Sequence, residues 1–314
     1  MEVANNVTEF IFLGLSQDPG MQLMFFALFL FFYIVIMVGN LLILLTVFSD
    51  PRLHTPMYFF LSNLSFVDIA YSSATAPKMI MLRDFLQRGK IISFSGCLAQ
   101  IYFLHFLGAS EMFLLTVMAY DRYVAICNPL HYLTLMNRQL CFQLVFACWC
   151  GGFIHSITQV MLVIQLPFCG PNELDNFYCD VPQVIKLACM DTYVVEVLMV
   201  SNSGLLSLIC FFVLLFSYAI ILTTLRTRFH QGRSKALSTC ASHLTVVSLI
   251  FVPCVFIYLR PFCSFSVDKI FSVFYTVITP MLNPLIYTLR NADMKTAMKK
   301  LRKKYVASFF HSKG

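Results

Sequence analysis

The chain has 314 residues, of which 59% are hydrophobic and only 12% are charged, and its net charge is +7. Soluble domains average about 25% charged residues, so this composition and a mean hydropathy of +0.78 exclude an ordinary soluble protein. The basic residues lie mostly in short gaps between apolar runs and in the C-terminal tail, which argues against a nucleic-acid-binding face. The sequence therefore predicts an integral membrane protein.

The first 22 residues are predicted to form a polar extracellular segment. They contain Glu2, Glu9 and Asp18 but no basic start, so we expect no cleavable signal peptide and expect the first apolar run to act as its own insertion signal. Asn6-Val7-Thr8 is a glycosylation sequon, and we expect Asn6 to carry a glycan because the segment is short, polar and lumenal.

Seven apolar stretches are each long enough to cross about 30 Å of hydrocarbon as a helix. Helices are the only option at these lengths, because backbone groups in lipid need internal hydrogen bonds. The second, third and sixth stretches are interrupted by polar residues and are weaker by hydropathy. The sequence thus predicts an all-α, seven-transmembrane helix bundle over residues 23–290, with spans at 23–48, 57–81, 92–126, 140–166, 195–225, 236–260 and 268–290.

The distribution of Lys and Arg predicts the orientation of the bundle. With the N-terminus outside, the inner segments and the tail hold 15 of the 22 basic residues and the outer segments hold six, as expected from the positive-inside rule. The first outer loop is a local exception. Residues 291–314 are then a cytoplasmic tail, in which the basic stretch 295–304 predicts a short amphipathic helix on anionic lipid. A solvated charged tail is the alternative.

Most of the twelve cysteines lie inside predicted spans, where a free cysteine acts as a small apolar residue. Cys97 lies at the outer start of the third span, and Cys169, Cys179 and Cys189 share the outer loop between the fourth and fifth spans. Disulfides are expected there because that side is oxidising. Four cysteines allow three pairings. A zinc site is a weaker alternative, and Cys263 is expected to stay free.

Two carboxylates lie deep inside predicted spans, Asp68 in the second and Glu111 in the third. An ionisable group at that depth is a functional hypothesis by default. The pair could share a sodium ion or a proton, and the alternative is a polar network without an ion. Asn40, Ser110 and Asn283 are candidate further members. No other metal or cofactor is predicted.

Four long motifs stand at the ends of predicted spans. They are His54–Leu61 at the start of the second, Met118–Tyr132 at the end of the third, Lys235–Leu244 at the start of the sixth and Pro280–Asn291 at the end of the seventh. The triplet Asp121-Arg122-Tyr123 alone is weak evidence, but four long motifs in order are strong. Over nearly its whole length the chain resembles odorant receptors, a branch of the rhodopsin-like G-protein-coupled receptors.

That resemblance implies a function and several partners. It implies a receptor that binds a small odorant, activates a stimulatory, olfactory-type G protein and raises cyclic AMP, in the plasma membrane of olfactory cilia. It also implies the disulfides Cys97–Cys179 and Cys169–Cys189, and a sodium and water site at the position of Asp68.

The resemblance further implies a set of switch residues. Asp121 and Arg122 would form a latch beside Tyr123, which opens to free the arginine for the G protein. Pro284 removes a helical hydrogen bond and permits a kink, beside Asn283. Tyr287 could then swing toward the bundle, with Tyr218 as its candidate partner. The alternative for Asp121 and Arg122 is a static interfacial ion pair.

The resemblance places the ligand among the outer halves of spans three, five and six. Hydrogen-bond candidates are Tyr258, Asn202 and His105, and the chain departs from many relatives at Phe251 and Pro253 in span six. A mostly apolar pocket favours a neutral volatile. The full predicted set is Leu104, His105, Gly108, Ala109, Met112, Gln159, Asn202, Ser203, Leu206, Phe251, Val255, Tyr258 and Thr276.

Other functions fit less well. A non-olfactory chemosensory receptor of the same fold remains an alternative, because sequence does not report tissue. A small transporter would show internal repeats with matched broken helices, and none is seen. A membrane enzyme would need a catalytic cluster, and Asp68 and Glu111 lack the necessary companions, so the chain is predicted not to be an enzyme.

Overall fold

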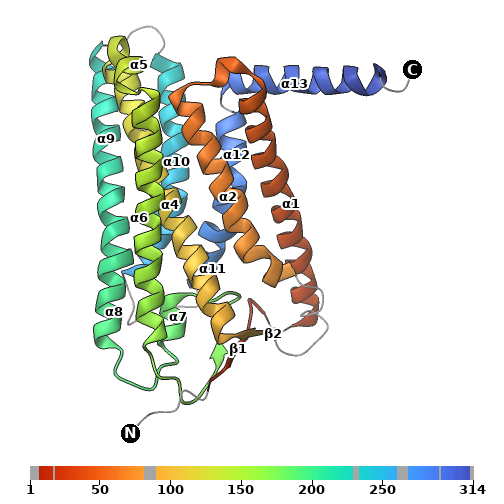
Figure 1. The fold of residues 1–314 in the computed structure, drawn as a ribbon, viewed down its shortest axis with the longest axis vertical. Coiled ribbons are helices and arrows are strands. Elements are labelled where there is room, and N and C mark those ends of the chain that lie inside the picture. Colours follow the sequence, from red (N-terminus) through yellow and green to blue (C-terminus); the bar gives the residue numbers. More distant parts are fainter. Residues whose placement is uncertain are drawn as a thin grey trace.

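The computed structural model describes residues 7–16, 18–80, 90–228, 233–259, 268–289 and 291–311. Helical rods lie side by side along the long axis of the molecule (Figure 1) and match the predicted spans to within a few residues. In chain order they are α1 (Pro19–Ser49), α2 (Pro56–Ile80), α4 (Phe94–Cys127), α6 (Arg138–Ile164), α8 and α9 (Tyr193–Met199 and Leu206–Arg228, joined by the π-helical turn Val200–Leu205), α10 (Arg233–Tyr258), and α11 and α12 (Asp268–Val273 and Thr279–Leu289, joined by the π-helical turn Phe274–Ile278).

Five helical segments of the described chain are long and apolar enough to cross a membrane on their own. The third predicted span is among them despite its polar residues. The second is not, and the sixth appears only as the shorter apolar helix His243–Tyr258. Polar residues lower the mean hydropathy of these two helices. Some of them, such as Asp68 and His243, are buried in the interior of the bundle.

Side chains cap the helices where polar residues precede the apolar runs. Asp18 accepts a hydrogen bond from Met21 N at 2.9 Å at the start of α1, and Pro19 fits the first helical position. Asn137 accepts from Leu140 N at 2.9 Å and begins α6 in the same way. Pro253 and Pro284 lie inside α10 and α12, where each removes one helical hydrogen bond.

Helix α4 is the central element of the bundle, because it packs against α2, α6, α9 and α10. More than half of its most apolar stretch, 56%, is buried, compared with 22% for α1. Residues of α4 therefore reach both ends of the bundle interior.

Helices α4 and α6 approach each other closely at Gly152. A Cβ atom at this position would lie 2.2 Å from the Ser110 hydroxyl and 2.6 Å from the Phe106 carbonyl oxygen. We expect Gly152→Ala to destabilise the bundle by about 1–3 kcal/mol, measured as a lower melting temperature of the detergent-solubilised receptor. Gly170→Ala is the matched control, because no atom lies within 4 Å of its added Cβ. Equal melting temperatures for the two variants would contradict the prediction.

A small sheet at one end of the bundle corrects the all-α prediction. Strand β1 (Glu9–Phe12) pairs antiparallel with β2 (Lys90–Ser93) and parallel with β3 (Glu173–Leu174). Phe10 and Phe12 on β1 are buried. The strands are too short to be recognised from sequence, and their partners are distant in the chain. The third helix consequently begins at Phe94 rather than at residue 92.

Short elements lie at the other end of the bundle, which contains Arg122. They include α5 (Tyr132–Leu135) and α13 (Ala292–His311). Helix α13 includes the basic stretch 295–304, lies roughly at right angles to the long helices and extends outward past α1 (Figure 1). Its binding to anionic lipid stays a prediction.

Candidate functional site

A cavity lies between α4, α9, α10 and the segment that precedes α7 (Val181–Ile185). Its volume is about 60 Å³. The predicted residues that line it are Leu104, His105, Gly108, Ala109, Met112, Ser203, Leu206 and Tyr258. Further lining residues, which the sequence did not indicate as pocket residues, are Tyr71, Glu111, Phe113, His155, Tyr178, Asp180, Ser207, Cys210, Ile250, Cys254 and Tyr275.

Five predicted ligand residues are not in this lining. Gln159 is buried behind it and donates to the Ser203 hydroxyl, and Asn202 contacts the His155 carbonyl oxygen at 3.5 Å. Phe251 is buried and stacks on Phe211, with ring centroids 5.9 Å apart.

The other two are Val255 and Thr276. Val255 is half-buried on α10, and the Thr276 hydroxyl donates back to the Ser272 carbonyl at 2.6 Å. The cavity lining in this structure does not include these residues, and their contact with a ligand stays a prediction.

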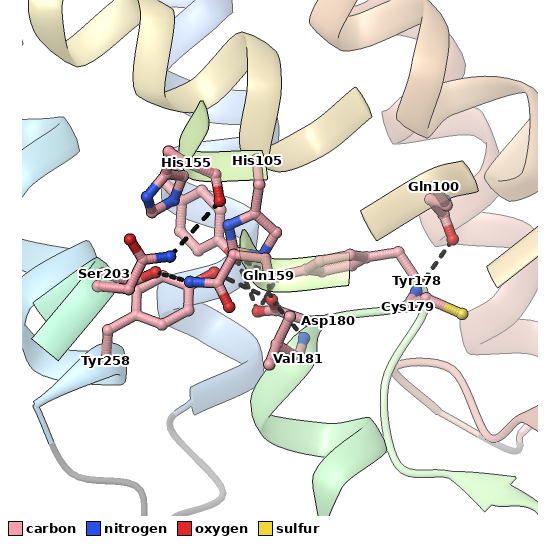
Figure 2. Close-up of polar contacts among 12 residues, drawn as sticks. Gln100, His105, His155, Gln159, Tyr178, Cys179, Asp180, Val181, Ser203 and Tyr258 are labelled. Atoms are coloured by element: carbon pink, nitrogen blue, oxygen red, sulfur yellow. Dashed lines mark hydrogen bonds and ion pairs between the residues drawn. The ribbon is translucent and has the colours of Figure 1, made fainter. Parts of the chain in front are cut away.

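Asp180 is the main polar group of the cavity and comes from the loop, not from a span. Its Oδ1 accepts from Tyr258 at 3.0 Å and from Val181 N at 2.9 Å. Its Oδ2 lies 3.3 Å from the hydroxyls of both Tyr178 and Tyr275. Figure 2 shows this carboxyl group among the side chains of the surrounding helices.

Two histidines complete the polar end of the cavity. His105 Nε2 lies 3.4 Å from Asp180 Oδ1, and the rings of His105 and His155 are 5.5 Å apart between centroids. Both are buried. His105 was a predicted hydrogen-bonding residue, whereas His155 and Asp180 were missed, although the position of Asp180 directly after Cys179 was an available signal.

The disulfides explain how a loop residue reaches the bundle interior. Cys97 pairs with Cys179, and Cys169 pairs with Cys189, as the resemblance implied. The Cys179 amide also donates to Gln100 Oε1 at 3.0 Å (Figure 2). Helix α4 thus holds the loop at the residue before Asp180. The cavity and both bridges lie at the end of the bundle that carries the sheet.

The two intramembrane carboxylates meet in the structure. The Asn283 amide nitrogen lies 3.1 Å from both oxygens of Asp68 and 3.2 Å from Glu111 Oε1. All three residues are buried, and Glu111 also lines the cavity. Asn40 bonds instead to the Ile36 carbonyl, and Ser110 to the Phe106 carbonyl, so neither joins the carboxylates.

Oxygen atoms near this pair fit a hard cation. Among the described residues, Asn283 Oδ1 is a buried oxygen beside this pair that has no hydrogen-bond partner. The described residues contain no group of three or more His, Cys, Asp or Glu arranged to hold a metal. Sodium at Asp68 and Glu111 stays a prediction.

The predicted latch has a third member. Arg122 Nε lies 3.8 Å from Asp121 Oδ2, while the Tyr132 hydroxyl donates to Asp121 Oδ1 at 2.8 Å. Burial and the adjacent Asp121 charge raise the pKa of Tyr132 well above its usual value, so it stays a donor. Tyr123 stacks near Tyr120, with centroids 6.5 Å apart.

The sequence analysis named Tyr218 as a candidate partner for Tyr287 after a swing of Tyr287 toward the bundle. In this structure the two residues do not bond to each other. His243 lies between them. Its Nδ1 bonds to the Tyr218 hydroxyl, and its ring centroid is 6.2 Å from that of Tyr287. Within the described residues, the Tyr287 hydroxyl and His243 Nε2 are buried without a partner.

Two residues with predicted roles lie outside the described residues. They are Asn6, the expected glycosylation site, and Cys263, the cysteine expected to stay free.

A helical membrane bundle with a cavity near one end and an Asp-Arg pair on the same central helix near the other defines a G-protein-coupled receptor. The olfactory receptor family model matches residues 29–304. The chain is 79% identical to Olfactory receptor 4Q3 of Homo sapiens over 302 residues, 96% of each chain. It is 59% identical to Olfactory receptor 4S2 of Homo sapiens over the full length of both, and 59% identical to Olfactory receptor 4E2 of Mus musculus over 96% of this chain and 97% of that one.

The chain therefore belongs to the olfactory receptor family, and it is a multi-pass membrane receptor, not an enzyme.

Proposed function

We propose that this receptor binds a small neutral volatile in the cavity and activates a stimulatory, olfactory-type G protein, which raises cyclic AMP. The observation that carries the proposal is the layout of α4. This one helix supplies Leu104, His105 and Gly108 to the cavity and Asp121 and Arg122 to the opposite end. A change in the packing of α4 at the cavity can therefore reach the G-protein end.

The character of the cavity supports a small neutral ligand. Apolar side chains such as Leu104, Met112 and Ile250 form much of the lining, and the polar groups gather around Asp180. Ligand pockets are commonly mostly apolar with a few placed polar groups. The small volume favours compact ligands that displace flexible side chains such as Met112 and Leu206.

Signalling would follow from a shift between two packings of the bundle. A buried polar atom without a partner costs free energy, so the unpartnered Tyr287 hydroxyl and His243 Nε2 favour a second state in which they gain one. Pro253 and Pro284 remove helical bonds where α10 and α12 would bend. Arg122, released from Asp121, would then meet the G protein. Sodium bound at Asp68 and Glu111 would favour the resting state.

Charge and disulfide chemistry support the proposed orientation and location. The cystine-bearing end would face the oxidising outside, with the N-terminus, and the Arg122 end would face the cytoplasm, where most basic residues lie. We place the receptor in the plasma membrane of olfactory cilia, with membrane lipid, an odorant and the G protein as its partners.

A cyclic AMP screen tests the proposed function. Cells that express the receptor with an olfactory-type stimulatory G protein are exposed to a broad panel of volatiles, and surface receptor is measured by antibody staining of unpermeabilised cells. We expect a saturable rise in cyclic AMP for at least one compound, absent from mock-transfected cells. A receptor at the surface that responds to no compound would overturn the proposal.

Filling the cavity is expected to weaken every agonist found. A Cβ at Gly108 would meet only Tyr71, at 3.5 Å, so Gly108→Leu is expected to fold while it occupies ligand space. We expect the half-maximal concentration to rise at least about tenfold, about 1.4 kcal/mol of binding free energy. Gly170→Leu in the loop is the control. Unchanged potency of all agonists in Gly108→Leu would place the ligand elsewhere.

A further inference from the structure

The tyrosine hydroxyls that surround Asp180 donate hydrogen bonds to its carboxyl group or to one another. Tyr258 donates to Oδ1, and Tyr178 and Tyr275 lie at hydrogen-bonding distance from Oδ2. The hydroxyls of Tyr178 and Tyr275 also bond to each other. Donors around both oxygens are the environment of a carboxylate, which accepts hydrogen bonds and donates none.

Counting hydrogens shows what is left for a ligand. Each tyrosine hydroxyl has one hydrogen and can accept as well. The hydrogen of Tyr258 is directed at Asp180, and the two hydrogens of Tyr178 and Tyr275 are used on Asp180 and on each other. Burial and the charge of Asp180 raise the pKa of Tyr178 well above its usual value, so its hydrogen stays in place.

His105 extends the same pattern. Its Nε2 faces Asp180 Oδ1 at 3.4 Å, and a hydrogen on this nitrogen leaves Nδ1 as an acceptor in the neutral ring. Asp180, Tyr178, Tyr258, Tyr275 and His105 all line the cavity and together form what we call the Asp180 cluster. Unused lone pairs, rather than unused hydrogens, are therefore what this cluster offers.

We propose that the Asp180 cluster selects ligands that donate a hydrogen bond, namely alcohols and phenols, over ethers and aldehydes of the same size. This inference rests on the proposed function. An ether or aldehyde oxygen placed against the cluster would bring lone pairs against lone pairs, and it could accept a hydrogen bond only away from the cluster, for example from Ser203. A hydroxyl compound donates to the cluster and can still accept, for example from Ser203, whose oxygen already accepts from Gln159.

The experiment compares matched probes on the wild-type receptor. Straight-chain alcohols of about five to nine carbons are set against the aldehydes and methyl ethers of equal length, and phenol against anisole. Cyclic AMP is measured over a full concentration range. We expect each responding alcohol or phenol to be at least about tenfold more potent than its matched ether or aldehyde.

Asp180→Asn then tests the source of the preference. The asparagine amide group donates hydrogen bonds, so it would donate to a tyrosine oxygen and release a tyrosine hydrogen toward the cavity. We expect the preference for alcohols to fall to about twofold or to reverse. Asp191→Asn, an exposed loop carboxylate outside the cavity, removes the same charge and should keep the wild-type ranking. Asp180→Glu retains a group that only accepts hydrogen bonds, so this variant should still prefer alcohols to ethers and aldehydes.

The outcomes separate this inference from the proposed function. Ethers or aldehydes that match or exceed their alcohols on the wild-type receptor would overturn the inference and leave the function intact. The same holds if Asp180→Asn reaches the surface and keeps the wild-type ranking. If that variant fails to reach the surface, the wild-type ranking decides. A surface receptor that responds to neither these probes nor the broad panel would overturn the proposed function itself.

Discussion

Arg122→Ala is expected to abolish ligand-driven cyclic AMP while the receptor remains at the cell surface. The Arg122 side chain is 19% exposed, whereas that of Asp121 is 1% exposed, so the space left by removing the arginine opens to solvent. Asp121 keeps its hydrogen bond from Tyr132, which compensates part of its burial. The loss should therefore appear in signalling, as a maximal response below about one hundredth of wild type, and not in folding.

Arg138→Ala is the matched control for this result. Arg138 is exposed at the start of α6, at the same end of the bundle, and its replacement should leave signalling near wild type. Arg122→Lys should restore only part of the response, because lysine keeps the charge but loses the planar fork of donors. Full signalling by Arg122→Ala, at equal surface level, would show that the Asp121–Arg122 pair is a static ion pair.

Loss of the Cys97–Cys179 bridge is expected to have the second large effect. The bridge closes a loop with a sequence separation of 82, and the chain-entropy relation assigns such a loop roughly 4 kcal/mol. Cys179 also precedes Asp180, so its release would misplace the carboxyl group that organises the polar end of the cavity. We expect Cys97→Ser to lower the surface level strongly and to remove the response of the receptor that remains.

Two further variants separate the bridge from the thiols. The double variant Cys97→Ser, Cys179→Ser should behave like either single variant, because all three lack the same disulfide bond. Cys150→Ser changes a free cysteine and should leave surface level and agonist potency unchanged. Normal surface level and normal potency of Cys97→Ser would contradict the proposed role of the bridge.

Much of the helical layout was predictable from residue pattern alone. The runs that became α1, α6 and α9 are apolar because lipid surrounds them, and this requirement is local and visible in sequence. The Asp121–Arg122 pair and the carboxylates Asp68 and Glu111 were also visible, because charges in apolar segments need partners. The bond from Tyr132 to Asp121 and the position of His243 between Tyr218 and Tyr287 were not.

The residues that line the cavity were only partly predictable from the local sequence. Gly108 and Met112 were correctly expected in the lining because α4 is regular over this stretch. Val255 and Thr276 lie outside the lining, in spans that contain a proline and a π-helical turn, and their contact with a ligand stays a prediction. The small sheet was missed because each strand finds its partners far away in the chain.

The sequence by itself determined a membrane protein with seven helical spans, and its motifs determined the resemblance to odorant receptors, because both are written in the order and spacing of residues. Only the tertiary structure decided that Asp180 enters the cavity and lies at hydrogen-bonding distance from the hydroxyls of Tyr178, Tyr258 and Tyr275. The reason is physical. A carboxyl group on a loop has no hydropathy signal, and its surroundings are set by a disulfide and by helices that are distant in the chain.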